Sequence, residues 1–127
     1  MSTTIGLGSQ TAMATGLSTY LATESLVIYD GIAPANAKTA LSSNTVCATH
    51  TLAGFIESNG VLTANAIASV TIAASSVGGV TFGRILVGGV SQWQGIVGAE
   101  ITVTPDANYV AGGTSNVTSM TLTTPDA

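Results

Sequence analysis

Hydrophobic and polar residues alternate along several short segments of the chain, and this period of two is typical of half-buried β-strands. The segment 45–52 shows the pattern most clearly. Its predicted faces are Val46, Ala48, His50 and Leu52 on one side, and Thr45, Cys47, Thr49 and Thr51 on the other. Further strands are predicted over residues 26–29, 61–74 (as one long strand or two short ones), 80–87, 90–97, 100–104 and 116–123.

Turn-forming residues separate these segments at intervals of about ten residues. Asn59-Gly60 is typical of a tight hairpin turn, and Gly88-Gly89 predicts a second hairpin between residues 80–87 and 90–97. Residues 33–44 are rich in alanine and serine and predict a loop. No alternation of strands and helices is present, so we expect a mainly β fold, an antiparallel sandwich or barrel.

One segment has helical periodicity, near the N-terminus. Met13, Leu17, Tyr20 and Leu21 form an apolar stripe within residues 10–23, and Ser9 is a suitable N-cap. We therefore expect one short N-terminal helix. The small and polar residues 1–8 predict a flexible arm, and residues 9–127 a single β-rich domain.

Charged residues make up only 6% of the 127 residues, against about 25% in a typical soluble domain. Hydrophobic residues reach 46%, so the composition is not that of a disordered chain. Few charges mean weak self-repulsion, and identical copies can therefore approach one another at little electrostatic cost. This composition favours an assembling protein, and we expect a homo-oligomer, most simply a trimer.

The same composition argues against two classes of partner. Two basic residues, Lys38 and Arg84, cannot neutralise a nucleic-acid backbone. Threonine, serine and asparagine interrupt the most apolar stretch, residues 61–74, so no membrane span is expected. The N-terminal sequence does not resemble a secretory signal, and the single Cys47 suits folding in a cytoplasm.

Candidate catalytic chemistry is limited to Cys47 and His50. Side chains three positions apart on a strand point to opposite faces, so these two cannot form a thiolate–imidazole pair there. One cysteine and one histidine also fall short of the four ligands of a structural zinc site. The six carboxylates are scattered along the sequence. We therefore expect no catalytic, metal or cofactor site, and no enzyme.

Three residues are candidates for an interface. Trp93 lies between polar residues, as either a core anchor or an interface residue. Arg84 lies between Phe82 and Leu86 on one strand face; it either extends over apolar surface to a rim or pairs with a carboxylate of another subunit. Tyr29, at the end of a short apolar run, is the third candidate.

Several segments resemble a family of small virion proteins of tailed bacteriophages. The resemblance covers roughly residues 10–124. The segments that carry it are Leu26-Val-Ile-Tyr-Asp-Gly31 with the following Ala33-Pro34-Ala35, Lys38-Thr-Ala-Leu-Ser42, Asn59-Gly-Val-Leu-Thr-Ala-Asn-Ala-Ile-Ala-Ser69, the strand–turn–strand 81–98 and the Ser/Thr-rich end 117–123. It implies a structural protein of the virion, assembled in the host cytoplasm, on the capsid exterior or at the tail.

Three functions follow as hypotheses. The first is a capsid decoration (cement) protein that bridges major capsid subunits. The second is a component of the tail tube or neck. The third, of another class, is a carbohydrate- or ligand-binding β module with Trp93 as a stacking platform.

Overall fold

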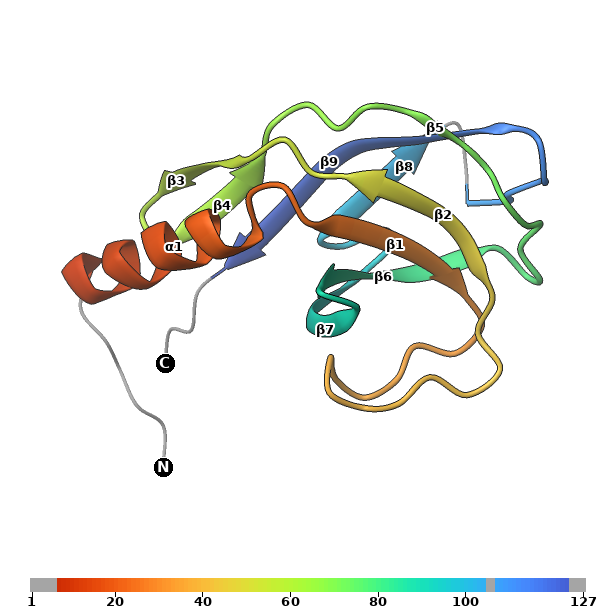
Figure 1. Cartoon of the computed structure of the whole chain (residues 1–127), viewed down its shortest axis with the longest axis horizontal. Helices are drawn as coiled ribbons and strands as arrows, with labels where there is room; N and C mark the ends of the chain where they lie inside the picture. The colour runs from red at the N-terminus through yellow and green to blue at the C-terminus, as the bar shows by residue number, and fades with distance from the viewer. Residues whose placement is uncertain (1–6, 105–106, 124–127) are drawn as a thin grey trace.

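The computed structural model describes residues 7–104 and 107–123, and these form one helix and two antiparallel sheets (Figure 1). The elements are α1 (Leu7–Leu21), β1 (Ser25–Asp30), β2 (Val46–Thr51), β3 (Phe55–Ser58), β4 (Val61–Ala64), β5 (Val70–Thr71), β6 (Val80–Val87), β7 (Val90–Ile96), β8 (Ile101–Thr104) and β9 (Thr114–Thr123). The predicted mainly β class is confirmed. Of the two architectures, the sandwich-like one is present, because the sheets of the described residues do not close into a barrel.

The first sheet has the strand order β2-β1-β6-β7 and the second the order β3-β4-β9-β5. The long strand β9 organises the second sheet. It pairs with β4 near its C-terminal end, with β5 near its N-terminal end, and with β8 between them. The predicted segment 61–74 thus forms two short strands.

Both predicted hairpin turns are present. Asn59 and Gly60 have φ angles of 51° and 82°, and Gly88 and Gly89 have 59° and 83°. Two successive positive φ angles are the requirement of the type I′ turn, whose twist matches that of the strands it joins. The first turn joins β4 to β3, a strand that the sequence analysis missed. A hairpin turn at Asn59-Gly60 requires a strand on each side, so the sequence did contain a signal for β3.

The main core lies between the two sheets and beneath α1. It contains Leu26 and Ile28 of β1, Ile85 of β6, and Leu62 and Leu122 of the second sheet. The helix contacts β3 and β4, where the first sheet does not reach, and so completes the second layer (Figure 1).

Two details of the predicted helix are wrong. It begins at Leu7, before the expected N-cap Ser9, and ends at Leu21. Its buried side is formed by Ala14, Leu17 and Leu21, whereas Met13 and Tyr20 are exposed. The small residue Ala14 thus lies on the buried side of the helix, in the main core. Of the predicted arm 1–8, residues 1–6 lie outside the described residues.

The predicted faces of β2 are also partly wrong. A β-bulge shifts the register between Ile28 and Tyr29, which pair with Ala48 and Val46 and leave Cys47 as the extra residue. As a result Cys47 and Ala48 are both buried, and Val46 is exposed. A bulge inserts one residue into the alternation, and the periodicity of the sequence alone does not show it.

Candidate functional site

The outer face of the first sheet, away from the main core, carries a second buried cluster. Tyr29 stacks on Phe82 with ring centroids 5.0 Å apart and an interplanar angle of 13°. Val27 packs with them, and Ala33 and Leu86 lie at the edge. Burial raises the pKa of Tyr29, and the nearby Arg84 charge opposes that effect. The candidate Tyr29 is therefore a buried packing residue of this chain.

Arg84 lies beneath the loop between β1 and β2 and is only 5% exposed. Its Nη2 donates to the carbonyl oxygens of Asn36 (3.2 Å) and Thr39 (2.6 Å), and its Nε donates to Oε1 of Gln94 (2.9 Å). The guanidinium carbon lies 5.9 Å from the centroid of the Phe82 ring. These partners give Arg84 a role inside the chain, as the residue that fastens the loop to the sheet, and not at an exposed rim.

Gln94 and Asp30 complete the attachment of this loop. Gln94 Nε2 donates to Pro34 O at 2.7 Å. The buried Asp30 carboxylate accepts the backbone N–H groups of Thr45 (2.7 Å) and Val77 (2.8 Å). These two hydrogen bonds lower the pKa of Asp30. The carboxylate thus joins the end of the β1–β2 loop to the β5–β6 loop.

Trp93 is partly buried and packs against the main core. Its indole lies over Gly95, since a Cβ at that glycine would come within 2.1 Å of the ring. Trp93 lines neither of the two cavities described below. Of the two alternatives left open by the sequence, the structure shows the core contact; a part of the side chain remains exposed.

The closest approach to catalytic geometry is a pair that the sequence analysis did not find. His50 Nε2 lies 2.7 Å from Ser115 Oγ, which lies 2.7 Å from the Tyr109 hydroxyl. His50 Nδ1 lies 2.9 Å from Ala68 O, and because a carbonyl only accepts, Nδ1 carries the proton. The unprotonated Nε2 then accepts from Ser115, which accepts from Tyr109.

This hydrogen-bonded chain is closed to solvent. His50 and Ser115 are fully buried, and neither lines the two cavities. Burial lowers the pKa of His50, so the ring is held neutral. These hydrogen bonds join β2 of the first sheet to β9 of the second. They therefore hold the two sheets together through buried polar groups. The sequence carries no local signal for this contact, because His50 and Ser115 are 65 positions apart.

Cys47 lies in the same core and has different partners. Its Sγ is 3.6 Å from Thr45 O, and burial raises the pKa of the thiol. No hydrogen bond between Cys47 and His50 occurs among the contacts of the described residues. Within residues 7–104 and 107–123, no three potential metal ligands gather, and no helix is long and apolar enough to cross a membrane.

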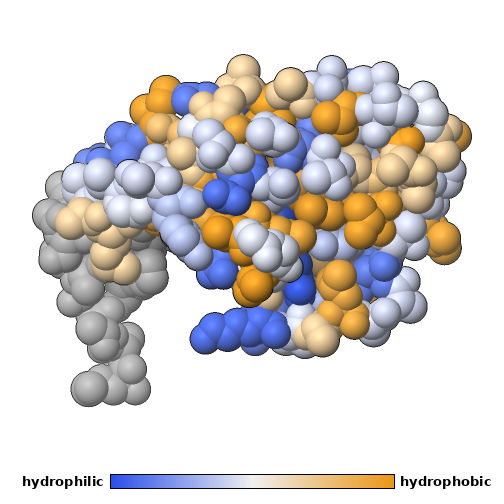
Figure 2. Space-filling model, in the orientation of Figure 1, coloured by the Kyte–Doolittle hydropathy of each residue, from blue (hydrophilic) through white to orange (hydrophobic). Residues whose placement is uncertain are grey.

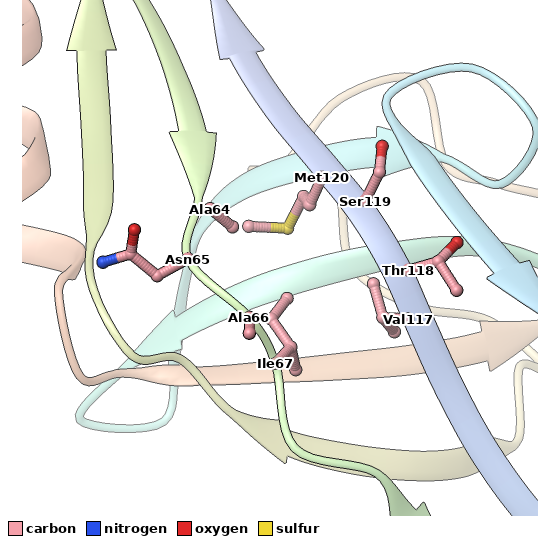
Figure 3. A pocket seen from close by; sticks show the side chains of 8 residues that line it. All are labelled: Ala64, Asn65, Ala66, Ile67, Val117, Thr118, Ser119 and Met120. Carbon is pink, nitrogen blue, oxygen red and sulfur yellow. The ribbon is translucent and has the colours of Figure 1, made fainter.

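A first cavity opens where the second sheet splits (Figure 3). The segment that follows β4 leaves the sheet at Asn65, whose side chain donates to Ala53 O at 3.0 Å. The resulting gap of about 300 Å³ is lined by Ala64, Asn65, Ala66, Ile67 and residues 117–120 of β9. In Figure 3, Met120 and Val117 point towards the departing segment, whereas the Asn65 amide points away from the gap. Small and aliphatic side chains therefore dominate it.

A second cavity is a groove on the outer face of the first sheet, with a volume of about 380 Å³. Val27, Tyr29 and Leu86 form its apolar part, and the exposed Val46 and Thr49 line its β2 side. Its remaining lining is Glu24, Ser25, Gly88 and Gly89. The groove continues the buried Tyr29 cluster beyond the area that the loop covers.

Comparison of the chain with protein-family models, with curated proteins and with solved structures finds no match.

Proposed function

We propose that this chain is a structural protein of a tailed-bacteriophage virion, a capsid decoration protein that binds across neighbouring major capsid subunits as a homo-oligomer. The observation that carries the proposal is the low content of charge, 6% of all residues, on a chain with a well-packed two-sheet core. Such a chain has ample apolar and hydroxyl-bearing surface with which to contact neighbours. The resemblance over residues 10–124 supplies the biological setting.

The character of the surface supports the proposal. Weakly polar and apolar side chains cover most of the face in Figure 2, and strongly hydrophilic residues are scattered over it. A decoration protein gains from many weak contacts made at once, because each further contact is nearly intramolecular and raises the avidity by roughly 10²–10⁴. Contacts of this kind depend little on salt, since few charges take part.

The buried chemistry fits a protein that binds by its surface. Ser115 and His50 are fully buried, and so are the hydrogen bonds that join them to each other and to Tyr109. The alternative of a carbohydrate-binding module rested on Trp93, and that indole packs on the core beside Gly95. We therefore place the decoration role first and a tail or neck role second.

Purified particles test the proposal. Gel densitometry against the major capsid protein should give a copy number of the same order for a decoration protein, and a far smaller number for a tail tube or neck ring. Imaging should place the protein on the capsid surface at threefold or quasi-threefold positions. Particles without it should release DNA at a lower temperature, and the added protein should restore stability. Density at the tail alone would contradict the decoration role.

A further inference from the structure

The turn between β3 and β4 places an asparagine next to a glycine at the surface of the protein. Asn59 is the one asparagine of the chain that a glycine follows, and it is exposed. The amide carbon of an asparagine side chain can be attacked by the backbone nitrogen of the next residue. A following glycine hinders this attack least, because it has no Cβ. Asn59-Gly60 is therefore the pair of residues in this chain at which the reaction meets the least steric hindrance.

The reaction is deamidation through a cyclic imide, and water is its only co-reactant. The Gly60 N–H loses its proton to hydroxide, and the electron pair of the nitrogen forms a bond to Cγ of Asn59. The bond between Cγ and the side-chain nitrogen breaks, and this nitrogen takes a proton from water and leaves as ammonia. Water then opens one of the two C–N bonds of the imide, and the product is aspartate or isoaspartate.

The attacking nitrogen is engaged in a hydrogen bond in the structure. The Gly60 N–H donates to Oε2 of Glu57 at 2.9 Å, and Gly60 itself is buried. The nitrogen must give up this hydrogen bond and lose its proton before it can attack. Because a hydrogen bond to a charged acceptor is stronger than one to a neutral acceptor, its loss adds to the barrier of the reaction.

The conformation of the turn also opposes the reaction. Asn59 and Gly60 have the two positive φ angles of a type I′ turn, 51° and 82°. In such a turn ψ of the first central residue is about +30°. Closure of the five-membered imide ring requires Asn59 to rotate about its Cα–C bond and leave this conformation. The antiparallel ladder of β3 and β4 fixes both ends of the turn, from the pair Ser58 and Val61 onwards, and so resists that rotation.

We propose that Asn59 is a deamidation site of this chain and that Glu57 is the positioning residue that slows the reaction by binding the Gly60 N–H. Deamidation adds a negative charge to a charge-poor surface, and isoaspartate also inserts Cβ into the main chain of a tight turn. Both strands of this hairpin contact α1, so a change in the turn reaches the packing of the helix. The reaction does not depend on what the surface of the protein binds, and it therefore goes beyond the proposed function.

Mass spectrometry of the tryptic fragment 39–84 measures the reaction, because this fragment contains Asn44, Asn59 and Asn65. The folded protein is kept at mildly alkaline pH, and the conversion of each amide to an acid is followed with time. Glu57→Ala should accelerate the conversion of Asn59 about tenfold or more. Glu57→Gln keeps an acceptor oxygen and should react more slowly than Glu57→Ala.

Two variants and one solvent condition are the controls. Glu100→Ala removes a carboxylate that accepts a different backbone N–H, that of Ile96 at 3.1 Å. Val90→Ser changes an exposed residue at the second type I′ turn. Both should leave the rate at Asn59 unchanged. In urea the wild-type protein and Glu57→Ala should react equally fast, and faster than the folded wild-type protein, because the turn and the hydrogen bond are absent there.

Four results would overturn the proposal. The folded wild-type protein could react at Asn59 as fast as it does in urea, or Glu57→Ala could react no faster than the wild-type protein; either result would show that Glu57 does not slow the reaction. Equal rates in Glu57→Gln and Glu57→Ala would show that the accepted hydrogen bond is not the cause. Conversion of Asn44 or Asn65 before Asn59 in folded Glu57→Ala would contradict the choice of site.

Discussion

At the scale of single residues, buried polar groups define this molecule more than its few charges do. His50, Ser115 and Tyr109 form hydrogen bonds with one another inside the core, whereas Arg84 and Asp30 bind backbone groups of the loop between β1 and β2. A buried polar group without a partner costs about 1–3 kcal/mol, so each of these positions tolerates few other side chains.

The neutral state of His50 makes the stability of the fold depend on pH. Its pKa in the folded chain is lowered from 6.5 by burial, so between the two values the unfolded chain binds a proton that the folded chain does not. Stability is therefore full above about pH 6.5 and is lost as the pH falls towards the folded-state pKa. Urea unfolding between about pH 7.5 and pH 5 should show this decline.

The variant His50→Gln provides the control for this effect. It should lower stability by about 1–3 kcal/mol at neutral pH and abolish most of the slope in this window. The neighbouring groups titrate elsewhere, because the pKa of Cys47 and of Tyr109 is raised and that of Asp30 is lowered. An unchanged slope in the variant would assign the pH dependence to another group.

At the scale of elements, glycines in strands decide how closely the layers approach. A Cβ at Gly83 of β6 would lie 2.8 Å from Ile101 Cδ1 and 3.1 Å from Ile28 Cδ1, both inside the main core. Gly95, which pairs with Gly83 across β6 and β7, leaves the space that the Trp93 indole fills. Strand glycines of this kind mark a close approach of other groups.

Gly95→Ala should displace Trp93 from its place against the core. The new Cβ would come within 2.1 Å of the ring, so the indole or the strand must shift. Overpacking of this kind costs about 1–3 kcal/mol. The single tryptophan of the chain reports on the change directly, as a red shift of its fluorescence. Gly16→Ala, at a helical position with open space around it, should leave the emission unchanged.

At the scale of the whole molecule, the first sheet is covered on both sides. The second sheet covers one face, and the loop between β1 and β2 covers part of the other (Figure 1). Hydrogen bonds from Arg84 and Gln94, and not an extended apolar core, hold this loop against the sheet. Loss of these hydrogen bonds should therefore free the loop while the sheets remain folded.

Arg84→Met tests this arrangement by proteolysis. Methionine keeps an apolar stem over Phe82 but donates no hydrogen bond, and hydrogen bonds to a charged group contribute about 1.5–3 kcal/mol. The chain has two basic residues, Lys38 and Arg84, so the loop residue Lys38 is the one trypsin site that remains in the variant. Cleavage after Lys38 should accelerate about tenfold or more. Equal cleavage in Arg84→Met and in the control Val90→Ser would show that the loop is held by other contacts.

The sequence by itself determined the class of the fold, the helix near the N-terminus and both type I′ turns. Those features depend on local rules, namely the period of hydrophobic residues and the φ angles that Asn and Gly allow. The tertiary structure alone decided where the buried side departs from that period. The bulge at Cys47 reversed the predicted side of Val46, and the sheet selected Ala14 over Met13 as the buried helix residue. It also decided that Arg84 and Tyr29 lie inside the chain and that His50 meets Ser115, because such contacts join strands distant in sequence, and no local pattern records them.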